Sequence, residues 1–530
     1  MLKKMLALLL AWLMLLPAFA VAEDYGFNAE GYPIVDEQIT LSVMFPRSTS
    51  QPTDFSDMYL VRTFREKLGI NLEFELVESS AFNERKALAI ASGDYTDIFF
   101  KGITAEDEAM YGAQGIFIDL SELIEKYAPN FTALMEQYPE IRAAITYEDG
   151  AIYSMPVIYT AARDRIAPIS YYNIEWLKNL GLEAPETLDD LYNVLVAFRD
   201  QDANGNGDPS DEKPVTYTAG NTVFKSSILA ALGISGTEDD IVDDKYVFVP
   251  ASEQYKEYLK YMKKLYEEKL LDPDVFILSA EEYGTYIRDN LVGVGDDTTP
   301  YTYVENYAER YDVLPMLTSE TFTEKIWPGQ QFVYRNTGNF VVTDKCKYPE
   351  AAVRMIDYCF TTEGSLMVRS GPEDGVWGGE GGWHIVKDEA GNELYSVITY
   401  DTEKYTSYYN FREQHSPMGM PYNSSDYMGF VMTAGDPKAG WSFQRRIDTR
   451  PVPNLEINYP LVMFTADEQD VINTCLTDMR NYVSSMEVKF ITGEADIDGT
   501  WEEYIKTLNK MGMDKVIAAK QAAYDRYTAK

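Results

Sequence analysis

The fold is decided by residues 39–100, which read ITLSVMFPRSTSQPTDFSDMYLVRTFREKLGINLEFELVESSAFNERKALAIASGDYTDIFF. Apolar and polar residues alternate over 39–45 and again over 71–77, and this period of two residues predicts two β-strands. The apolar run 97–100 predicts a third, short and buried strand.

The segments between these strands have helical spacing. Apolar side chains recur every three or four residues over 57–68 and 82–91, and each run stops at a glycine, Gly69 or Gly93, as helix C-termini commonly do. The resulting order strand–helix–strand–helix–strand predicts an α/β sheet with parallel strands and right-handed crossovers. Ligands of such sheets lie beyond the carboxyl ends of the strands.

A second α/β region is predicted after residue 169. Thr187 is suited to begin the amphipathic run 188–199, since its hydroxyl can accept a hydrogen bond from a free backbone N–H. The further expected elements are helices at 174–180, 255–270 and 349–360, short strands at 291–294, 311–314 and 340–342, and two C-terminal helices within 501–527.

The composition excludes several classes of function. The chain has 530 residues, 45% of them hydrophobic, which suffices for roughly two to four packed domains. Its 85 acidic against 46 basic side chains give a net charge of -39, which disfavours binding to nucleic acid. With His384 and His415 as the only histidines and 3 scattered cysteines, zinc catalysis and CxxC redox sites are excluded. Cys346, Cys359 and Cys475 leave at least one thiol unpaired, and the sequence does not choose a disulfide among them.

The first 22 residues have the pattern of a secretory signal peptide. Lys3 and Lys4 precede an apolar run and a small-residue stretch that ends at Ala22, where we expect cleavage, with Ala20 as the alternative. The run is shorter than the ~20 residues of a membrane-spanning helix. No cysteine lies near the cleavage point, so a lipid anchor is not expected, and the mature protein is predicted to be extracytoplasmic, periplasmic or secreted.

The segment DQDANGNGDPSDE, residues 200–212, predicts a structural calcium site. Oxygen-bearing side chains alternate with glycines that let the chain wrap around an ion, as in EF-hand loops. The loop has two possible registers, one beginning at Asp200 with Gly205 at position six and one beginning at Asp202 with Gly207 there. The candidate ligands are Asp202, Asn204, Asn206, Asp208, Asp211 and Glu212.

Other motifs indicate no chemistry. The glycine-rich run 375–383 lacks the Lys-Ser/Thr ending of a phosphate-binding loop, and no G-x-S-x-G nucleophile motif is present. Paired carboxylates for glycoside hydrolysis are uninformative among 85 acidic residues.

Taken together, the segments resemble the extracellular solute-binding proteins of carbohydrate ABC importers, in particular their large branch of roughly 500 residues. The stretches that carry the resemblance are 31–35 (GYPIV), 82–84 (FNE), 91–98 (ASGDYTDI), 176–191 (WLKNLGLEAPETLDDL) leading into the acidic loop, 345–352 (KCKYPEAA) and 490–501 (FITGEADIDGTW).

The resemblance implies a two-lobed periplasmic-binding-protein-like α/β fold, each lobe a mainly parallel sheet flanked by helices, with the ligand cleft between the lobes. It also implies an oligosaccharide ligand, the permease subunits of an ABC importer as partners, no catalytic residue, a monomer, and calcium in the acidic loop. That loop is one residue longer than the common family form, which leaves the ligand at Ser210 or Asp211 open.

The expected division of the chain follows from this resemblance. It comprises a signal peptide (1–22), a first lobe (23–165), a second lobe with the calcium loop (166–288), a return to the first lobe (289–342), a second part of the second lobe (343–500), and C-terminal helices (501–530).

Ligand contacts are expected from residues at strand ends and from aromatic side chains in loops, because aromatic faces stack on sugar rings. These are Phe45, Arg47, Gly102, Tyr159, Trp327, Trp377 and Trp383. Two alternative functions stay open, a secreted carbohydrate-active hydrolase or lyase and a binding protein for peptides or another nutrient.

Overall fold

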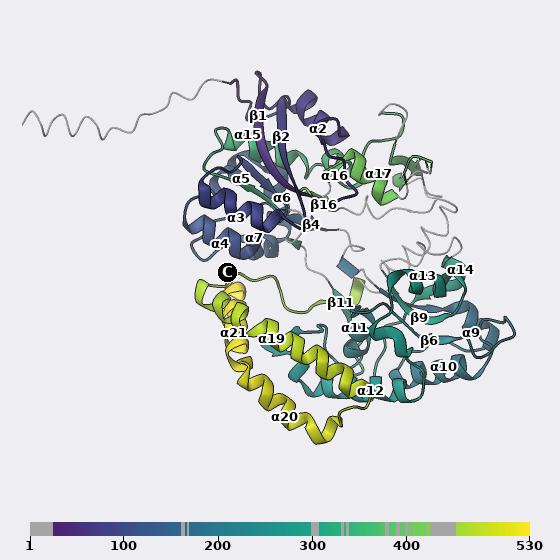
Figure 1. Ribbon diagram of the computed structural model, residues 1–530. Coiled ribbons are helices and arrows are strands. Elements are labelled where there is room, and N and C mark those ends of the chain that lie inside the picture. Colours follow the sequence, from purple (N-terminus) through teal and green to yellow (C-terminus); the bar gives the residue numbers. More distant parts are fainter. Residues whose placement is uncertain are drawn as a thin grey trace, which may run out of the picture.

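The computed structural model shows two α/β lobes joined by strands that cross between them (Figure 1). The residues that the structure describes are 25–160, 165–166, 169–297, 307–329, 333–334, 339–376, 381–387, 393–397, 401, 403–405, 408–417, 419–424 and 452–529. Within them, no helix is both long and apolar enough to span a membrane.

Lobe 1 is built on a four-stranded sheet in the order β13-β3-β1-β2. Strand β1 (Ile39–Arg47) is parallel to both β2 (Ile70–Glu78) and β3 (Ile98–Phe100), whereas β13 (Phe340–Val342) is antiparallel to β3. The predicted parallel arrangement is therefore confirmed for the three strands from residues 39–100.

The helices between these strands end where the sequence predicts. Gly69 and Gly93 close them in the left-handed conformation, with φ of 79° and 73°, which costs a glycine little because it lacks a Cβ. The helices of lobe 1 are α2 (Tyr59–Thr63), continued by the π-helical turn η1 (Phe64–Leu68), α3 (Phe82–Ser92), α4 (Ala105–Ala113), α5 (Ser121–Tyr127), α6 (Pro129–Gln137), α7 (Pro139–Ile145), α15 (Pro349–Tyr358), α16 (Thr362–Ser370) and α17 (Tyr408–His415).

Lobe 2 has a four-stranded sheet in the order β10-β5-β9-β6. Here β5 (Ile169–Asn173) is antiparallel to β9 (Val292–Asp297) and to β10 (Tyr311–Val313), and only β6 (Lys213–Val215) is parallel to β9. The prediction of a mainly parallel sheet is wrong for this lobe. The reason is that β5 begins at the junction with lobe 1 and runs away from it, whereas β9 runs back toward the junction.

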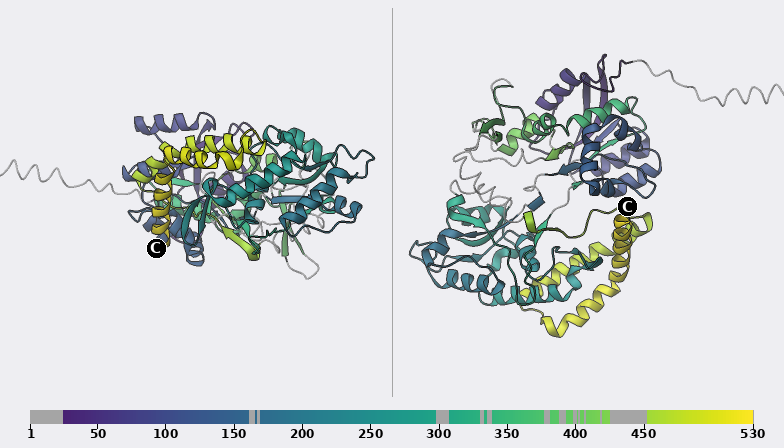
Figure 2. Two further views of the ribbon diagram at one scale, coloured as in Figure 1. Left: turned by 90° about the horizontal axis from the view of Figure 1, so that it is seen from below. Right: turned by 180° about the vertical axis from the view of Figure 1, so that it is seen from behind.

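Helices cover the lobe 2 sheet, and the C-terminal helices are added to this lobe (Figures 1 and 2). Thr187 begins α10 and accepts a hydrogen bond from the Asp190 backbone N–H at 3.0 Å, as predicted. The helices are α9 (Ile174–Leu180), α10 (Leu188–Asp200), α11 (Val223–Ala230), α12 (Glu253–Glu267), α13 (Ala280–Arg288), α14 (Tyr307–Arg310), α19 (Ala466–Ile491), α20 (Ile497–Lys510) and α21 (Met513–Thr528); β7 (Asp239–Val242) and β8 (Lys245–Phe248) form a hairpin.

The connections between the lobes contain short strands. On the lobe 1 side, β4 (Val157–Tyr159) pairs with β12 (Val333–Tyr334) and with β16 (Asn423–Ser424). On the lobe 2 side, β11 (Trp327–Gly329) pairs in parallel with β17 (Leu455–Ile457). These pairings bring three distant parts of the chain together at the junction.

The observed lobes differ from the expected division of the chain. Strands β9 and β10 lie in the lobe 2 sheet, although 289–342 was expected to return to lobe 1. Helix α15 is buried in the lobe 1 core, although 343–500 was expected in lobe 2. An apolar pattern shows that an element has a face to bury, but it does not show which sheet covers that face.

All three cysteines, Cys346, Cys359 and Cys475, are free thiols. Cys359 is fully buried in the lobe 1 core and behaves as a small apolar side chain. Burial raises the pKa of the Cys346 thiol to about 12, which keeps it protonated and unreactive at neutral pH.

Candidate functional site

The end of β1 contributes one core residue and one loop-organising residue. Phe45 is fully buried, with its ring centroid 5.3 Å from that of Phe55, so it belongs to the core and is not available to a ligand. The prediction is wrong because both faces of this part of β1 are covered: Val43 and Phe45 pack in one core cluster and Met44 packs in another. Arg47 forms an ion pair with Glu78 and donates to the Gln51 carbonyl oxygen at 2.7 Å, which shapes the loop after β1.

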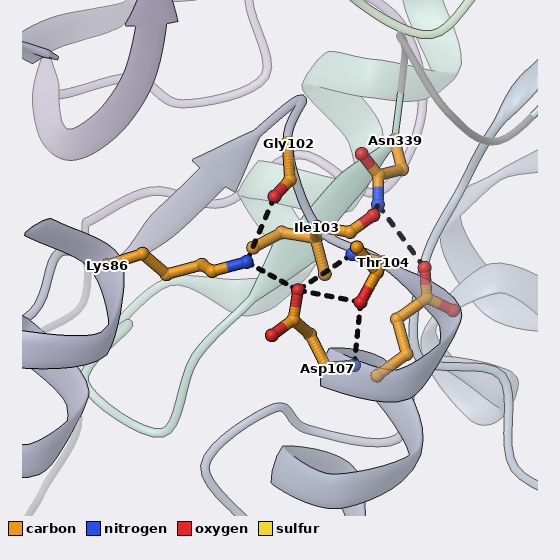
Figure 3. A network of polar contacts seen from close by, with 7 residues as sticks. Lys86, Gly102, Ile103, Thr104, Asp107 and Asn339 are labelled. Atoms are coloured by element: carbon orange, nitrogen blue, oxygen red, sulfur yellow. Dashed lines mark hydrogen bonds and ion pairs between the residues drawn. The ribbon is translucent and has the colours of Figure 1, made fainter. Parts of the chain in front are cut away.

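Gly102 follows β3 and is held by a buried ion pair (Figure 3). Lys86 Nζ lies 2.5 Å from Asp107 Oδ2 and 3.2 Å from the Gly102 carbonyl oxygen. A Cβ at Gly102 would lie 2.5 Å from the Phe82 ring, and φ is +78°, so glycine is required here for two independent reasons. Gly102 therefore acts through the shape of the chain.

A second part of the same network ties β13 to α4. Asn339, which is fully buried, donates to the Ile103 carbonyl oxygen at 2.7 Å and to Glu108 Oε1 at 3.3 Å (Figure 3). Ser154 also donates to Glu108 Oε1, at 2.8 Å. These bonds hold the carboxyl end of β3 rigidly at the edge of the sheet.

Tyr159 ends β4, the first strand that leaves lobe 1 toward lobe 2. The next residue, Thr160, donates to Asn423 Oδ1 at 2.8 Å and also contacts the Ser424 carbonyl oxygen. The structure thus places Tyr159 at the junction of the lobes, partly exposed.

Trp327 lies in a pocket of about 200 Å³ on lobe 2, between α11 and β11. Its indole N–H donates to the Ile166 carbonyl oxygen at 3.3 Å, and 8% of the residue is exposed. Six hydroxyl side chains and one amide share the pocket walls: Ser170, Thr222, Ser226, Ser227, Ser235, Thr237 and Asn458. The sequence analysis missed these residues because single serines and threonines from separate elements form no pattern.

A second candidate tryptophan, Trp383, does not line this pocket. Trp383 begins β14 (Trp383–Lys387), which pairs with β15 (Glu393–Val397), and its indole N–H donates to the Gly371 carbonyl oxygen at 3.0 Å beside α16 in lobe 1. Trp377 lies outside the described residues. The two lobes therefore each hold one described candidate tryptophan.

The acidic loop after α10 has two buried carboxylate oxygens that lack a hydrogen-bond partner. Asp202 Oδ2 accepts from the Gly207 backbone N–H at 2.9 Å, while its Oδ1 is buried without a partner. Glu212 Oε1 accepts from the Ala203 N–H at 2.8 Å, while its Oε2 is likewise buried and unpaired. Burial raises the pKa of the Glu212 carboxyl group, as expected for an acid removed from water.

The remaining loop side chains arrange themselves around these oxygens. Asp211 accepts from Asn204 Nδ2 at 3.1 Å and from Asn206 Nδ2 at 2.7 Å, so it folds over the loop. Asp208 accepts from the Ser210 hydroxyl at 2.6 Å. Among the described residues, no three His, Cys, Asp or Glu side chains are grouped tightly enough to bind a metal alone, so asparagine and backbone oxygens would have to complete this site.

The geometry distinguishes the two loop registers. Asp200 ends α10, and its carboxylate pairs with Arg199 through two bonds of 2.7 and 3.0 Å. Asp202 instead points into the loop, and Gly207, with φ of +92°, lies at the sixth position counted from it. The structure thus favours the register that begins at Asp202.

Comparisons with known proteins agree with this architecture. The family model described as "Bacterial extracellular solute-binding protein" matches residues 50–365, and one described as a domain of unknown function matches 460–529. The fructooligosaccharide ABC transporter substrate-binding protein FusA of Streptococcus pneumoniae is 31% identical over 96% of this chain and 94% of its own. Lipoprotein LipO of Bacillus subtilis is 28% identical over 49% of this chain and 50% of its own.

Solved structures extend the similarity to the whole fold. FusA in complex with kestose superposes with a TM-score of 0.73 at 27% identity and covers 93% of this chain and 100% of that chain. A solute-binding protein from Bifidobacterium longum infantis gives a TM-score of 0.76 at 20% identity over 93% and 100%, which supports the fold alone. The two-lobed architecture, the matched family model and the relationship to FusA together show that this chain belongs to the bacterial extracellular solute-binding proteins.

Proposed function

We propose that this protein captures an oligosaccharide between its two lobes and delivers it to the permease of an ABC importer. The observation that carries the proposal is the lobe 2 pocket, in which the Trp327 indole lies among six hydroxyl side chains. An aromatic face packs on the apolar face of a sugar ring, and hydroxyl groups exchange hydrogen bonds with its rim. The name of FusA and its complexes with kestose and fructo-nystose support the same ligand class.

The protein's action in this proposal is binding without chemistry. Its relatives are substrate-binding proteins, and closure of two lobes around a ligand is a known hinge mechanism. The junction strands β4, β11, β12, β16 and β17 would allow the rotation, while the networks around Gly102 and Asp107 keep lobe 1 rigid during it.

A melting experiment with a glycan panel tests the proposal. The pure protein is heated with kestose, nystose, maltotriose, xylotriose or a buffer blank, and each glycan is then recovered and chromatographed. We expect at least one glycan to raise the melting temperature and to be recovered intact. A flat panel would remove the oligosaccharide proposal, and cleaved glycan would favour a carbohydrate-active enzyme.

A tryptophan pair makes this test specific to the pocket. Trp327→Ala removes the pocket indole, whereas Trp501→Ala removes an indole of nearly equal exposure, 8% against 7%, that packs on Tyr504 in the C-terminal helices. Loss of an aromatic surface that packs on a sugar ring should cost about 1–3 kcal/mol of binding, so the Kd should rise about 5- to 150-fold in the first variant only. Equal affinities in the two variants would move the sugar site elsewhere.

We also propose that the loop 202–212 holds a structural calcium ion. The unpaired oxygens of Asp202 and Glu212 would supply its buried ligands, and the remaining predicted ligands are Asn204, Asn206, Asp208 and Asp211. A bound calcium ion would give these negatively charged oxygens a positively charged partner. One FusA structure is described as an EF-hand mutant, which indicates a loop of this kind in that relative.

We further propose that residues 1–22 are a cleaved signal peptide and that the mature protein works outside the cytoplasm as a monomer without a lipid anchor. The extracellular family supports the compartment. N-terminal sequencing of the exported protein should begin at residue 23, or at 21 if cleavage follows Ala20. Sedimentation should give the mass of one chain.

A further inference from the structure

Residues 460–529, which match a domain of unknown function, pack mainly in lobe 2 but contact lobe 1 at two places. Helices α19, α20 and α21 contribute Met479, Trp501 and Val516 to the lobe 2 core. The contacts with lobe 1 come from the segment before α19 and from the end of α21. The position of this region between the lobes indicates a role in how the lobes move.

The segment that joins β17 to α19 crosses from lobe 2 to lobe 1. Leu461 packs against the main core of lobe 1, and Met463 packs against a second apolar cluster of that lobe, around Phe99. Arg526 of α21 donates to the Met463 carbonyl oxygen at 3.2 Å and pairs with Glu468 at 2.7 Å. These bonds tie the crossing segment to the last helix of the chain.

The end of α21 faces helix α7 of lobe 1 across a cavity of about 360 Å³, which we call the rear pocket (Figures 1 and 2). Helix α7 contributes Glu140 and Ala144 to its walls, and α21 contributes Tyr524 and Tyr527. Burial raises the pKa of the Tyr527 hydroxyl, and the Glu140 carboxylate raises it further. These two side chains, from different lobes, therefore lie within electrostatic range of each other.

The rear pocket and the pocket around Trp327 lie on opposite sides of the chain that leaves β17. Asn458 directly follows this strand and lines both cavities, so it separates them. In Figure 1 the end of α21 lies to the left of β11 and α11, which form walls of the Trp327 pocket. A rotation about the junction that brings the walls together on one side must separate them on the other.

We infer that the C-terminal region is a brace that stabilises the open arrangement of the lobes, and we define the brace as Leu461, Met463, Arg526 and Tyr527. Closure around a ligand in front of the junction would draw lobe 1 away from these side chains behind it. Their contacts therefore favour the open form, and the apparent affinity falls with the fraction of molecules that can close. The inference rests on the proposed function and deepens it, because it assigns the control of closure to a region outside the sugar pocket.

Truncation of the brace should tighten binding, which is the opposite of what the loss of a ligand contact does. Titration calorimetry measures the Kd of the unmodified protein for kestose, nystose, maltotriose and xylotriose, and the tightest of these is then titrated into Met463→Ala and Tyr527→Ala. We expect each variant to lower the Kd about fivefold, equivalent to roughly 1 kcal/mol, because each loses the packing of one partly buried side chain in the open form.

The matched controls are Met511→Ala and Tyr482→Ala, whose side chains are also partly buried but pack against the lobe 2 core. Both controls should keep the Kd within about twofold of the unmodified protein. Small-angle X-ray scattering of the ligand-free proteins gives a second readout. The radius of gyration should fall in the two brace variants, because more molecules close, and should stay unchanged in the controls.

The outcomes separate the brace from the proposed function. If no glycan of the panel binds the unmodified protein, the oligosaccharide proposal fails and scattering alone tests the brace. If a glycan binds and both brace variants keep or raise its Kd, the contacts do not oppose closure and this inference alone fails. An unchanged radius of gyration in both ligand-free brace variants would also overturn it. Should Met463→Ala melt far below the unmodified protein, Tyr527→Ala decides, because Tyr527 lies in the last turn of the final helix and is partly exposed.

Discussion

Removal of calcium is the perturbation whose effect the structure defines most fully. Without the ion, Asp202 Oδ1 and Glu212 Oε2 are buried and unpaired. Each such atom costs about 1–3 kcal/mol, so an ion that satisfies both should stabilise the loop by roughly 2–6 kcal/mol. Independently, a Kd of ~10⁻⁶–10⁻⁴ M in 1 mM calcium gives about 1.4–4.1 kcal/mol, which overlaps this range.

The assay is a thermal melt in 1 mM calcium and again in excess EDTA. If lobe 2 unfolds as a unit of roughly 250 residues, the melting temperature should fall by about 3–8 °C on chelation and recover when calcium is restored. Asp202→Asn and Glu212→Gln remove the charge of a buried ligand and should abolish this difference. Asp200→Asn is the matched control, because the Asp200 carboxylate already pairs with Arg199, and it should keep the full difference.

Two results would refute this reasoning. Equal melting of the unmodified protein with and without EDTA would exclude a stabilising calcium ion. Loss of the EDTA effect in Asp200→Asn would assign the ion to the other register of the loop, in which Asp200 is the first ligand and Asp202 the third.

Three further perturbations test the supporting structure. Asp107→Ala should lower the free energy of unfolding by about 3–5 kcal/mol in urea melts, because it leaves the buried Lys86 ammonium with the Gly102 carbonyl as its acceptor. Lys86→Met should lower it by less. A larger loss in Lys86→Met than in Asp107→Ala would contradict this account of the ion pair. Gly102→Ala should cost at least about 1–3 kcal/mol, since φ is +78° and the new Cβ meets the Phe82 ring, and wild-type stability would refute this packing. Burial alone would raise the pKa of Glu468, but the ion pair with Arg526 and the hydrogen bonds from Thr465 outweigh it and lower this pKa. The stabilisation that the ionised Glu468 provides, roughly 1.5–3 kcal/mol, should therefore be complete above the unfolded pKa of about 4.3 and be lost as the pH falls through the lower folded pKa. In urea melts from pH 7 to pH 3, Glu468→Gln should not show this loss.

Much of the local structure could be predicted because its causes are local. The alternation over 39–45 and the glycines at 69 and 93 correspond to β1 and to two helix ends in the left-handed conformation. The hydroxyl of Thr187 begins α10 for the same kind of reason, a bond to an N–H three residues away. The acidic loop could also be recognised in the sequence, because the residues predicted to bind calcium are close together in the chain.

The candidate cleft residues were harder to predict, because contact with a ligand depends on which side chains remain uncovered. Phe45 has the same chemical character as a stacking residue, yet Phe55 covers it. The hydroxyl side chains of the pocket around Trp327 come from separate elements, and nothing in the sequence groups them.

By itself, the sequence determined the secondary structure of the first sheet, the oxygen-rich loop and the family resemblance, because each arises from residues near one another in the chain. The tertiary structure alone decided the antiparallel strands of lobe 2, the membership of α15 in lobe 1, the pairing of Asp200 with Arg199 and the residues that line the pocket around Trp327. These depend on packing between distant segments, where burial and pairing, rather than local spacing, select one arrangement among several that the same pattern allows.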